Sequence, residues 1–130
     1  MTLIFATNNL HKASEIKKIT GNRYEILTMA EAGILIDIPE PHATLKENAS
    51  EKSRTIHKIT QQNCFSEDTG LEVDALGGEP GVKTARYAGE TKTTADNIVK
   101  LLENLAGKKQ RTARFHTVIS LIWNQEEYFF

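Results

Sequence analysis

The sequence predicts an α/β protein, because short apolar segments typical of strands alternate with segments of helical periodicity in its first half. Residues Leu3 to Ala6 form an apolar strand, and after a polar loop a helix is expected from about Ala13 to Gly21. A second strand is expected from Tyr24 to Thr28, and a longer helix from about Thr44 to Ile59. With 130 residues, the chain has the size of one ordinary domain.

Both helices are expected to turn an apolar side toward the core. Ile16 and Ile19 lie at helical spacing in the first helix, and Gly21 ends it. In the second helix the apolar residues also recur at helical spacing, and the charged residues lie away from them. The residues of this helix expected to pack inward are Leu45, Ala49, Ile56 and Ile59.

The middle of the chain is expected to contain two short strands joined by a turn. Cys64 to Ser66 is apolar enough for a strand, and Glu67 to Gly70 has the composition of a turn. Apolar and acidic residues then alternate from Leu71 to Ala75, as in a half-buried strand. Residues Gly77 to Gly89 contain four glycines and Pro80, which favours an ordered loop.

The last part of the chain is expected to form a helix and a hairpin. Thr93 to Asp96 has the composition of a helix cap, and Gly107 follows the helix. The apolar face of this helix is Ile98, Leu101, Leu102 and Leu105. Thr112 to Trp123 predicts a long strand that turns at Asn124-Gln125 into a partner from Glu127. One side of the long strand carries Phe115, Ile119, Leu121 and Trp123.

Composition and charge exclude several classes of protein. The 16 basic and 17 acidic residues give a net charge of -1, which argues against a general binder of nucleic acids or anionic membranes. No stretch approaches the ~18 apolar residues of a membrane-spanning helix. The single cysteine, Cys64, excludes an internal disulfide and a four-cysteine zinc site, and is expected to be a small buried residue. We therefore expect a cytoplasmic protein.

The first candidate site is the polar loop between the first strand and the first helix. Such a loop presents free backbone N–H groups and the positive end of the helix to one point. Lys12 adds a full positive charge, so a polyphosphate could bind there. A plain polar loop with a helix cap is the open alternative. The residues concerned are Thr7, Asn8, Asn9, Leu10, His11 and Lys12.

The second candidate is the pair of adjacent carboxylates Glu67 and Asp68, which follow an apolar strand. Open α/β sheets bind their ligands at the carboxyl ends of strands. Carboxylate oxygens there suit Mg²⁺, which in turn engages the phosphates of a substrate. The alternative is a solvated turn.

Two further segments stay undecided on spacing alone. Glu40 precedes the long helix and Lys52 lies on it, but on spacing alone this side of the helix is more typical of a solvated face. Arg86 follows the glycine-rich segment, where it could bind phosphate or pair with a surface carboxylate. His116 on the long strand is expected to serve packing.

Taken together, these segments resemble the inosine triphosphate pyrophosphatase family. The matching blocks follow in the family's order from the first strand to Phe115: Phe5 to Ile16, Glu47 to Lys52, Glu67 to Val73, Ala75 to Gly81 and Ala85 to Gly89. The resemblance implies hydrolysis of ITP, dITP and XTP to the monophosphate and pyrophosphate, with Mg²⁺, to remove damaged purine nucleotides. It also implies a long mixed central sheet flanked by helices, two lobes around a nucleotide cleft, and a homodimer.

The resemblance also implies roles for individual residues. Thr7 to Lys12 matches the triphosphate-binding loop of the family, and Lys52 and Thr69 match further substrate contacts. Glu40 and Asp68 match the metal-binding acids of the family, and Glu67 is expected to help hold the metal. Asp68 also matches the catalytic acid position of the family.

The family continues beyond a strand like Phe129-Phe130 into a Gly-Phe-Gly-Tyr-Asp-Pro loop and a Ser-His-Arg segment that hold the base. We therefore expect residues 1–130 to form one pyrophosphatase domain that lacks the base-recognition segment, with the second lobe incomplete. The favoured function is that of the family, with little selective turnover by the 130 residues alone. A catalytically silent nucleotide- and metal-binding fragment is one alternative. A related pyrophosphatase of the septum-associated class, with another base preference, is the other.

Overall fold

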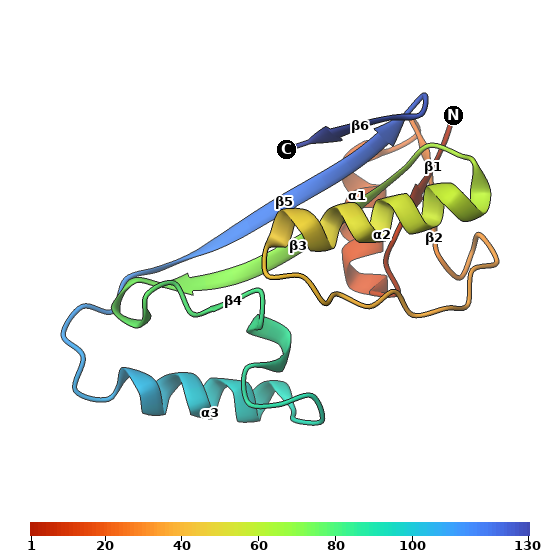
Figure 1. The fold of residues 1–130 in the computed structure, drawn as a ribbon. Coiled ribbons are helices and arrows are strands. Elements are labelled where there is room, and N and C mark those ends of the chain that lie inside the picture. Colours follow the sequence, from red (N-terminus) through yellow and green to blue (C-terminus); the bar gives the residue numbers. More distant parts are fainter. The chain divides into compact units, whose positions relative to one another are not determined.

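The computed structural model describes residues 1–130 (Figure 1). Its strands are β1 (Thr2–Phe5), β2 (Glu25–Thr28), β3 (Cys64–Val73), β4 (Pro80–Gly81), β5 (Ala113–Trp123) and β6 (Glu126–Phe129). Its helices are α1 (Leu10–Thr20), α2 (Leu45–Thr60) and α3 (Thr94–Leu105), with short 3-10 turns at Asp74–Leu76 and Thr84–Arg86. None of the helices is long and apolar enough to span a membrane.

The strands form one mixed sheet in the order β2-β1-β3-β5-β6, with β4 paired to β3. Strand β1 runs parallel to β2 and β3, whereas β3 and β4, like β5 and β6, are antiparallel. The predicted α/β class and mixed sheet are thus confirmed. The chain divides into a first unit (residues 1–42, 46–68 and 118–130) and a second unit (43–45 and 69–117).

The core of the first unit lies on both faces of β1. Neighbouring side chains of a strand point to opposite faces, so Ile4 and Phe5 enter different clusters. Ile4 packs with Ile56 of α2, and Phe5 packs with Ala13 of α1 and stacks on Phe65 at 4.5 Å between ring centroids. The two helices therefore cover opposite faces of the sheet (Figure 1).

Two of the residues expected to face inward do not do so. Ile19 and Ile59 are exposed, so their prediction as core residues was wrong. In α2 the buried stripe runs through the polar residues Asn48 and Ser53 to Ile56. The side of the helix that faces the sheet therefore differs from the side that the apolar residues alone predict. Ile59 lies outside the side that faces the sheet.

Strand β3 is continuous, so the predicted turn at Glu67–Gly70 was wrong. The strand pairs with β1 at its start, and with β4 through Leu71 and Glu72 near its end. Gly70 serves close packing here: a Cβ atom at this position would lie 2.5 Å from the carbonyl oxygen of Gly81. Glu67 and Asp68 consequently lie within an extended strand, where consecutive side chains point to opposite faces.

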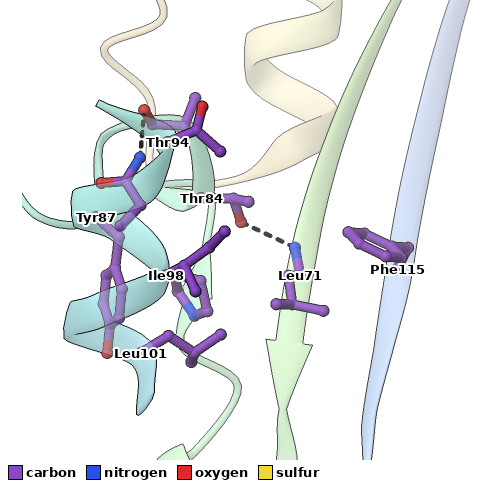
Figure 2. Close-up of a pocket in the computed structure, with 10 residues that line it drawn as sticks. Leu71, Thr84, Tyr87, Thr94, Ile98, Leu101 and Phe115 are labelled. Atoms are coloured by element: carbon purple, nitrogen blue, oxygen red, sulfur yellow. Dashed lines mark hydrogen bonds between the residues drawn. The ribbon is translucent and has the colours of Figure 1, made fainter. Parts of the chain in front are cut away.

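In the second unit, α3 begins with the predicted capping box. Thr93 accepts a hydrogen bond from the Asp96 N–H, and the Asp96 carboxylate accepts one from the Thr93 N–H. On the expected apolar face of α3, Leu105 is buried and Ile98 is about half exposed. On β5, Phe115 is largely exposed. An apolar pocket of about 310 Å³ lies between α3 and the strands of this unit (Figure 2).

The hairpin at the end of the chain is confirmed. Asn124 and Gln125 have φ values of 49° and 70°, as a two-residue turn of the type favoured between antiparallel strands requires. Strand β6 pairs with the second half of β5, with Ser120 opposite Phe129.

Cys64 is a buried residue, as expected. Its side chain has no exposed surface, and its Sγ lies 3.2 Å from the carbonyl oxygen of Ser53. Burial raises the pKa of the thiol to about 12, which keeps it protonated and unreactive at neutral pH.

Ile56→Ala is expected to destabilise the protein far more than Ile59→Ala on the same helix. Ile56 is fully buried, so its truncation leaves a cavity and costs about 2 to 5 kcal/mol. Ile59 is 53% exposed and should change the free energy of unfolding by about 0.5 kcal/mol. Urea unfolding followed by circular dichroism measures both. Equal losses would contradict the assignment of the buried stripe.

Candidate functional site

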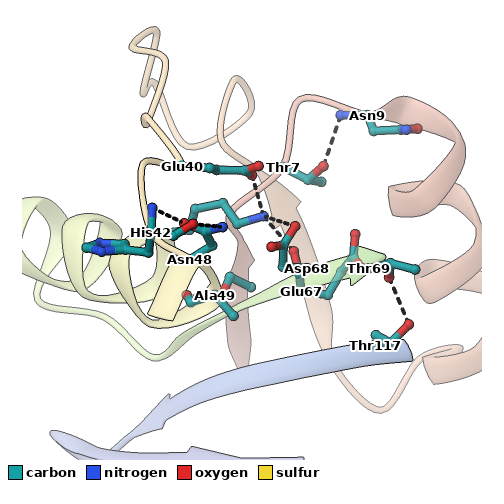
Figure 3. A network of polar contacts seen from close by, with 12 residues as sticks. Thr7, Asn9, Glu40, His42, Asn48, Ala49, Glu67, Asp68, Thr69 and Thr117 are labelled. Carbon is teal, nitrogen blue, oxygen red and sulfur yellow. Dashed lines mark hydrogen bonds and ion pairs between the residues drawn. The ribbon is translucent and has the colours of Figure 1, made fainter. Parts of the chain in front are cut away.

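The candidate site lies where β1 ends beside the parallel strand β3, which continues past this point. Phe5 pairs with Phe65, so the loop after β1 lies next to the acids that follow Phe65 on β3. A pocket of about 360 Å³ in the first unit opens there (Figure 3). Its polar lining residues are Thr7, Asn8, Lys12, Asp37, Glu40, Lys52 and Glu67.

The loop from Thr7 to α1 is held by its own side chains. Thr7 Oγ1 accepts the Asn9 N–H at 3.0 Å, and Asn9 caps α1 by accepting the Lys12 N–H at 3.1 Å. The first turn of α1 carries no acidic residue, so the positive end of its dipole is not offset locally. Leu10 and His11 have exposed side chains and do not line the pocket.

Lys12, Lys52, Glu40 and Glu67 line the pocket, and Asp68 lies next to it through its contact with Lys52. Lys12 forms an ion pair with Glu67. Lys52 Nζ lies 2.8 Å from Glu40 Oε1 and 3.9 Å from Asp68 Oδ1. The same ammonium donates a hydrogen bond to the carbonyl oxygen of Glu67 at 2.6 Å. Because the Lys52 side chain is only 12% exposed, its charge acts on the acids through little solvent.

The environment of the Asp68 carboxylate disfavours its charged form. Burial raises its pKa, and the negative charges of Glu40 and Glu67 raise it further, against the opposing effects of Lys52 and Asn48. Its Oδ2 atom is buried and has no hydrogen-bond partner. This oxygen is already shielded from solvent. It can therefore bind a cation or accept a hydrogen bond from a water molecule with little additional desolvation cost.

The carboxylate oxygens of Glu40 and Asp68 suit Mg²⁺ as a pair of protein ligands. No three His, Cys, Asp or Glu side chains converge into a ready-made metal cluster. Mg²⁺ is usually held by one or two carboxylates, with water and substrate phosphates completing its octahedron. Glu40 and Asp68 flank one point, the Lys52 ammonium, and Asp68 still has a free oxygen. These residues therefore suit a two-carboxylate site that a phosphorylated ligand completes.

Two predicted site residues belong to the second unit. Thr69 Oγ1 lies 2.8 Å from Thr117 Oγ1, and Arg86 Nε lies 3.4 Å from the Glu90 carboxylate. Arg86 thus has a surface carboxylate partner, which is one of the two alternatives left open by the sequence.

Asp37 at the pocket and Asn48 behind it were not predicted as site residues. Asp37 lines it, and the only signal in the sequence is its position shortly before Glu40. Asn48 is fully buried one helical turn before Lys52. A polar residue on the inward-facing stripe of a helix was the signal that could have identified Asn48.

The fold and this charged pocket define an α/β protein with acidic and basic side chains gathered where one parallel strand ends beside another. A sequence model of the Ham1 family matches residues 3–130, and the chain belongs to that family.

Comparison with individual proteins agrees with this assignment. The chain is 44% identical to the dITP/XTP pyrophosphatase of Flavobacterium johnsoniae, over 100% of this chain and 68% of that protein. It is 48% identical to the dITP/XTP pyrophosphatase of Porphyromonas gingivalis, over 98% of this chain and 66% of that protein. The Ham1 protein of Staphylococcus aureus has a similar structure, with a TM-score of 0.90 and 37% identity over 100% of this chain and 68% of that one.

These comparisons confirm the resemblance to nucleoside triphosphate pyrophosphatases drawn from the motifs. The chain spans about two thirds of the length of the relatives it matches.

Lys52→Met is expected to destabilise the protein by about 1 to 3 kcal/mol at neutral pH, because it leaves the partly buried Glu40 and Asp68 carboxylates without their cation. The folded-state pKa of Asp68 is already raised, so its contribution to stability is lost as pH rises above the ordinary range of an aspartate. Removing Lys52 raises that pKa further. The stability deficit should therefore be larger at pH 8 than at pH 5.

Thermal unfolding of the wild type and the variant at both pH values measures this effect. Lys58→Met, on the exposed side of the same helix, is the matched control and should show no pH-dependent deficit. A deficit that is the same at pH 5 and pH 8 would contradict the electrostatic role of Lys52.

Proposed function

We propose that this protein hydrolyses dITP, ITP and XTP to the monophosphate and pyrophosphate, with Mg²⁺. The observation that carries the proposal is the buried, unpartnered oxygen of Asp68 beside Lys52 and Glu40. The substrate class is supported by relatives that are 44% and 48% identical and are named dITP/XTP pyrophosphatases. A homodimer and a cytoplasmic location complete the proposal.

Glu40 and Asp68 would hold the Mg²⁺ ion, with Glu67 close by. When bound, Mg²⁺ would supply positive charge that neutralises the charge developing on the phosphate oxygens. Lys12 and Lys52 exchange their present carboxylate partners for the phosphates and hold the triphosphate in line for attack. The free amide groups at the start of α1 add further hydrogen-bond donors to the phosphates.

Asp68 orients the attacking water and accepts its proton. The water oxygen forms a bond to the α-phosphorus, and the bond from that phosphorus to the bridging oxygen breaks, so pyrophosphate leaves.

A second candidate is binding of nucleotide and metal without turnover. The observation that favours it is that the chain spans about two thirds of its relatives' length, so groups that read the base in those relatives can lie outside the match. A related pyrophosphatase with another base preference is separated from both by its rates on different triphosphates.

The decisive experiment compares the 130-residue chain with the same chain joined to the part of the Flavobacterium johnsoniae relative outside the match. Pyrophosphate release is measured with dITP, XTP and dGTP, with Mg²⁺ and with EDTA. We expect the joined protein to prefer dITP and XTP over dGTP by about tenfold or more, and to stop with EDTA. Equal rates on all three would contradict base selection, and nucleotide binding without release in both proteins would favour the silent alternative.

Asp68→Asn should lower pyrophosphate release from dITP by about 10²-fold or more, because the amide cannot accept the proton of water. Glu72→Gln is the matched control on the same strand, where the carboxylate pairs with Arg114 instead. We expect near wild-type rates for Glu72→Gln in the joined protein. Near wild-type rates for Asp68→Asn would remove Asp68 from the mechanism.

A further inference from the structure

Asn48 is a fully buried amide on the sheet-facing side of α2. Burying an amide costs free energy unless its donors and acceptor are hydrogen-bonded. A helix position that only needs packing is better filled by an apolar residue, as Ala49 and Ile56 do on the same side. The partners of Asn48 therefore indicate what the buried amide does.

The first partner of Asn48 is the backbone of His42. Asn48 Oδ1 accepts the His42 N–H at 3.0 Å, and Asn48 Nδ2 donates to the His42 carbonyl oxygen at 3.4 Å. Both polar groups of one loop residue are thus bound by one side chain. We call these two hydrogen bonds the backbone clamp. His42 lies two residues after Glu40, so the clamp restricts the position of the Glu40 carboxylate (Figure 3).

The second partner is the Asp68 carboxylate, to which the Asn48 side chain also donates a hydrogen bond. An amide nitrogen carries two N–H donors, so Asn48 can serve the loop and Asp68 at the same time. Figure 3 shows Asn48 between His42 and Asp68.

We propose that Asn48 is a positioning residue that holds the Glu40 loop and the Asp68 carboxylate in a single arrangement able to bind a divalent cation. This role rests on the proposed function, because it acts through the two acids assigned to the metal. Asn is suited to it since Leu has no polar atoms, Asp has no donor at neutral pH, and Ser has no second donor. Partners that orient metal ligands are typically worth 10- to 100-fold in metal affinity or activity.

The test measures the affinity of the 130-residue chain for Mn²⁺ alone, by electron paramagnetic resonance, beside the stability of each variant in urea. Asn48→Ala should weaken Mn²⁺ binding by about 10- to 100-fold, and the milder Asn48→Ser by less. Ser53→Ala is the matched control, since Ser53 is equally buried on the same helix but bonds Ser120 at 2.5 Å, away from the acids. His42→Ala leaves the backbone clamp in place and should bind Mn²⁺ like the wild type.

A structural role alone predicts that Asn48→Ala and Ser53→Ala both lose stability while Mn²⁺ affinity stays the same, and this result would overturn the proposal. If Asn48→Ala does not fold, unchanged Mn²⁺ affinity in Asn48→Ser would overturn it as well. A wild-type chain that does not bind Mn²⁺ overturns the metal site itself, and the positioning role with it. In the joined protein, Asn48→Ala should lower kcat with little change in KM, because Lys12 and Lys52 remain to bind the phosphates.

Discussion

The arrangement of the site depends on one buried cation, the Lys52 ammonium. It contacts Glu40 Oε1, the Glu67 carbonyl oxygen and Asp68 Oδ1, which come from the loop before α2 and from β3. Carboxylates that lie this close repel one another, and burial makes each charge more costly. Lys52 offsets that cost from one helix, and so ties the loop, the helix and the strand to one another. The Asp68 oxygen that Lys52 does not reach is the group left for chemistry.

The helix that carries Lys52 is unusual in the polarity of its buried side. Asn48 and Ser53 are fully buried there, and Ser53 is hydrogen-bonded to the buried Ser120 of β5. Ser66 of β3 in turn donates to the carbonyl oxygen of Ala49. Small polar side chains let the helix lie close to the sheet while their hydrogen bonds set its position along the strands. Exact placement of α2 matters because Lys52 and Asn48 reach the acids from it.

Much of the fold and part of the site could be predicted from the sequence. Alternating strands and helices, the caps at Asn9 and Thr93, and the hairpin at Asn124 all arise from local preferences of a few residues. Local preference also misled at Glu67–Gly70, whose turn-like composition is overridden by pairing on β3. The exposure of Ile59 and the contacts of Asn48 depend on which side of α2 meets the sheet, and helical spacing alone leaves that undecided.

The sequence by itself determined the α/β class, the family, and the residue types of a phosphate- and metal-binding site, because each of these is written in local patterns and their order. Only the tertiary structure decided which charges meet. Lys12 pairs with Glu67 across 55 positions of sequence, and Lys52 lies between Glu40 and Asp68. Such contacts arise where the end of β1 and the side chains of β3 meet helices from elsewhere in the chain. Spacing along the chain carries no record of them, since they are set by packing and by the need to pair buried charge.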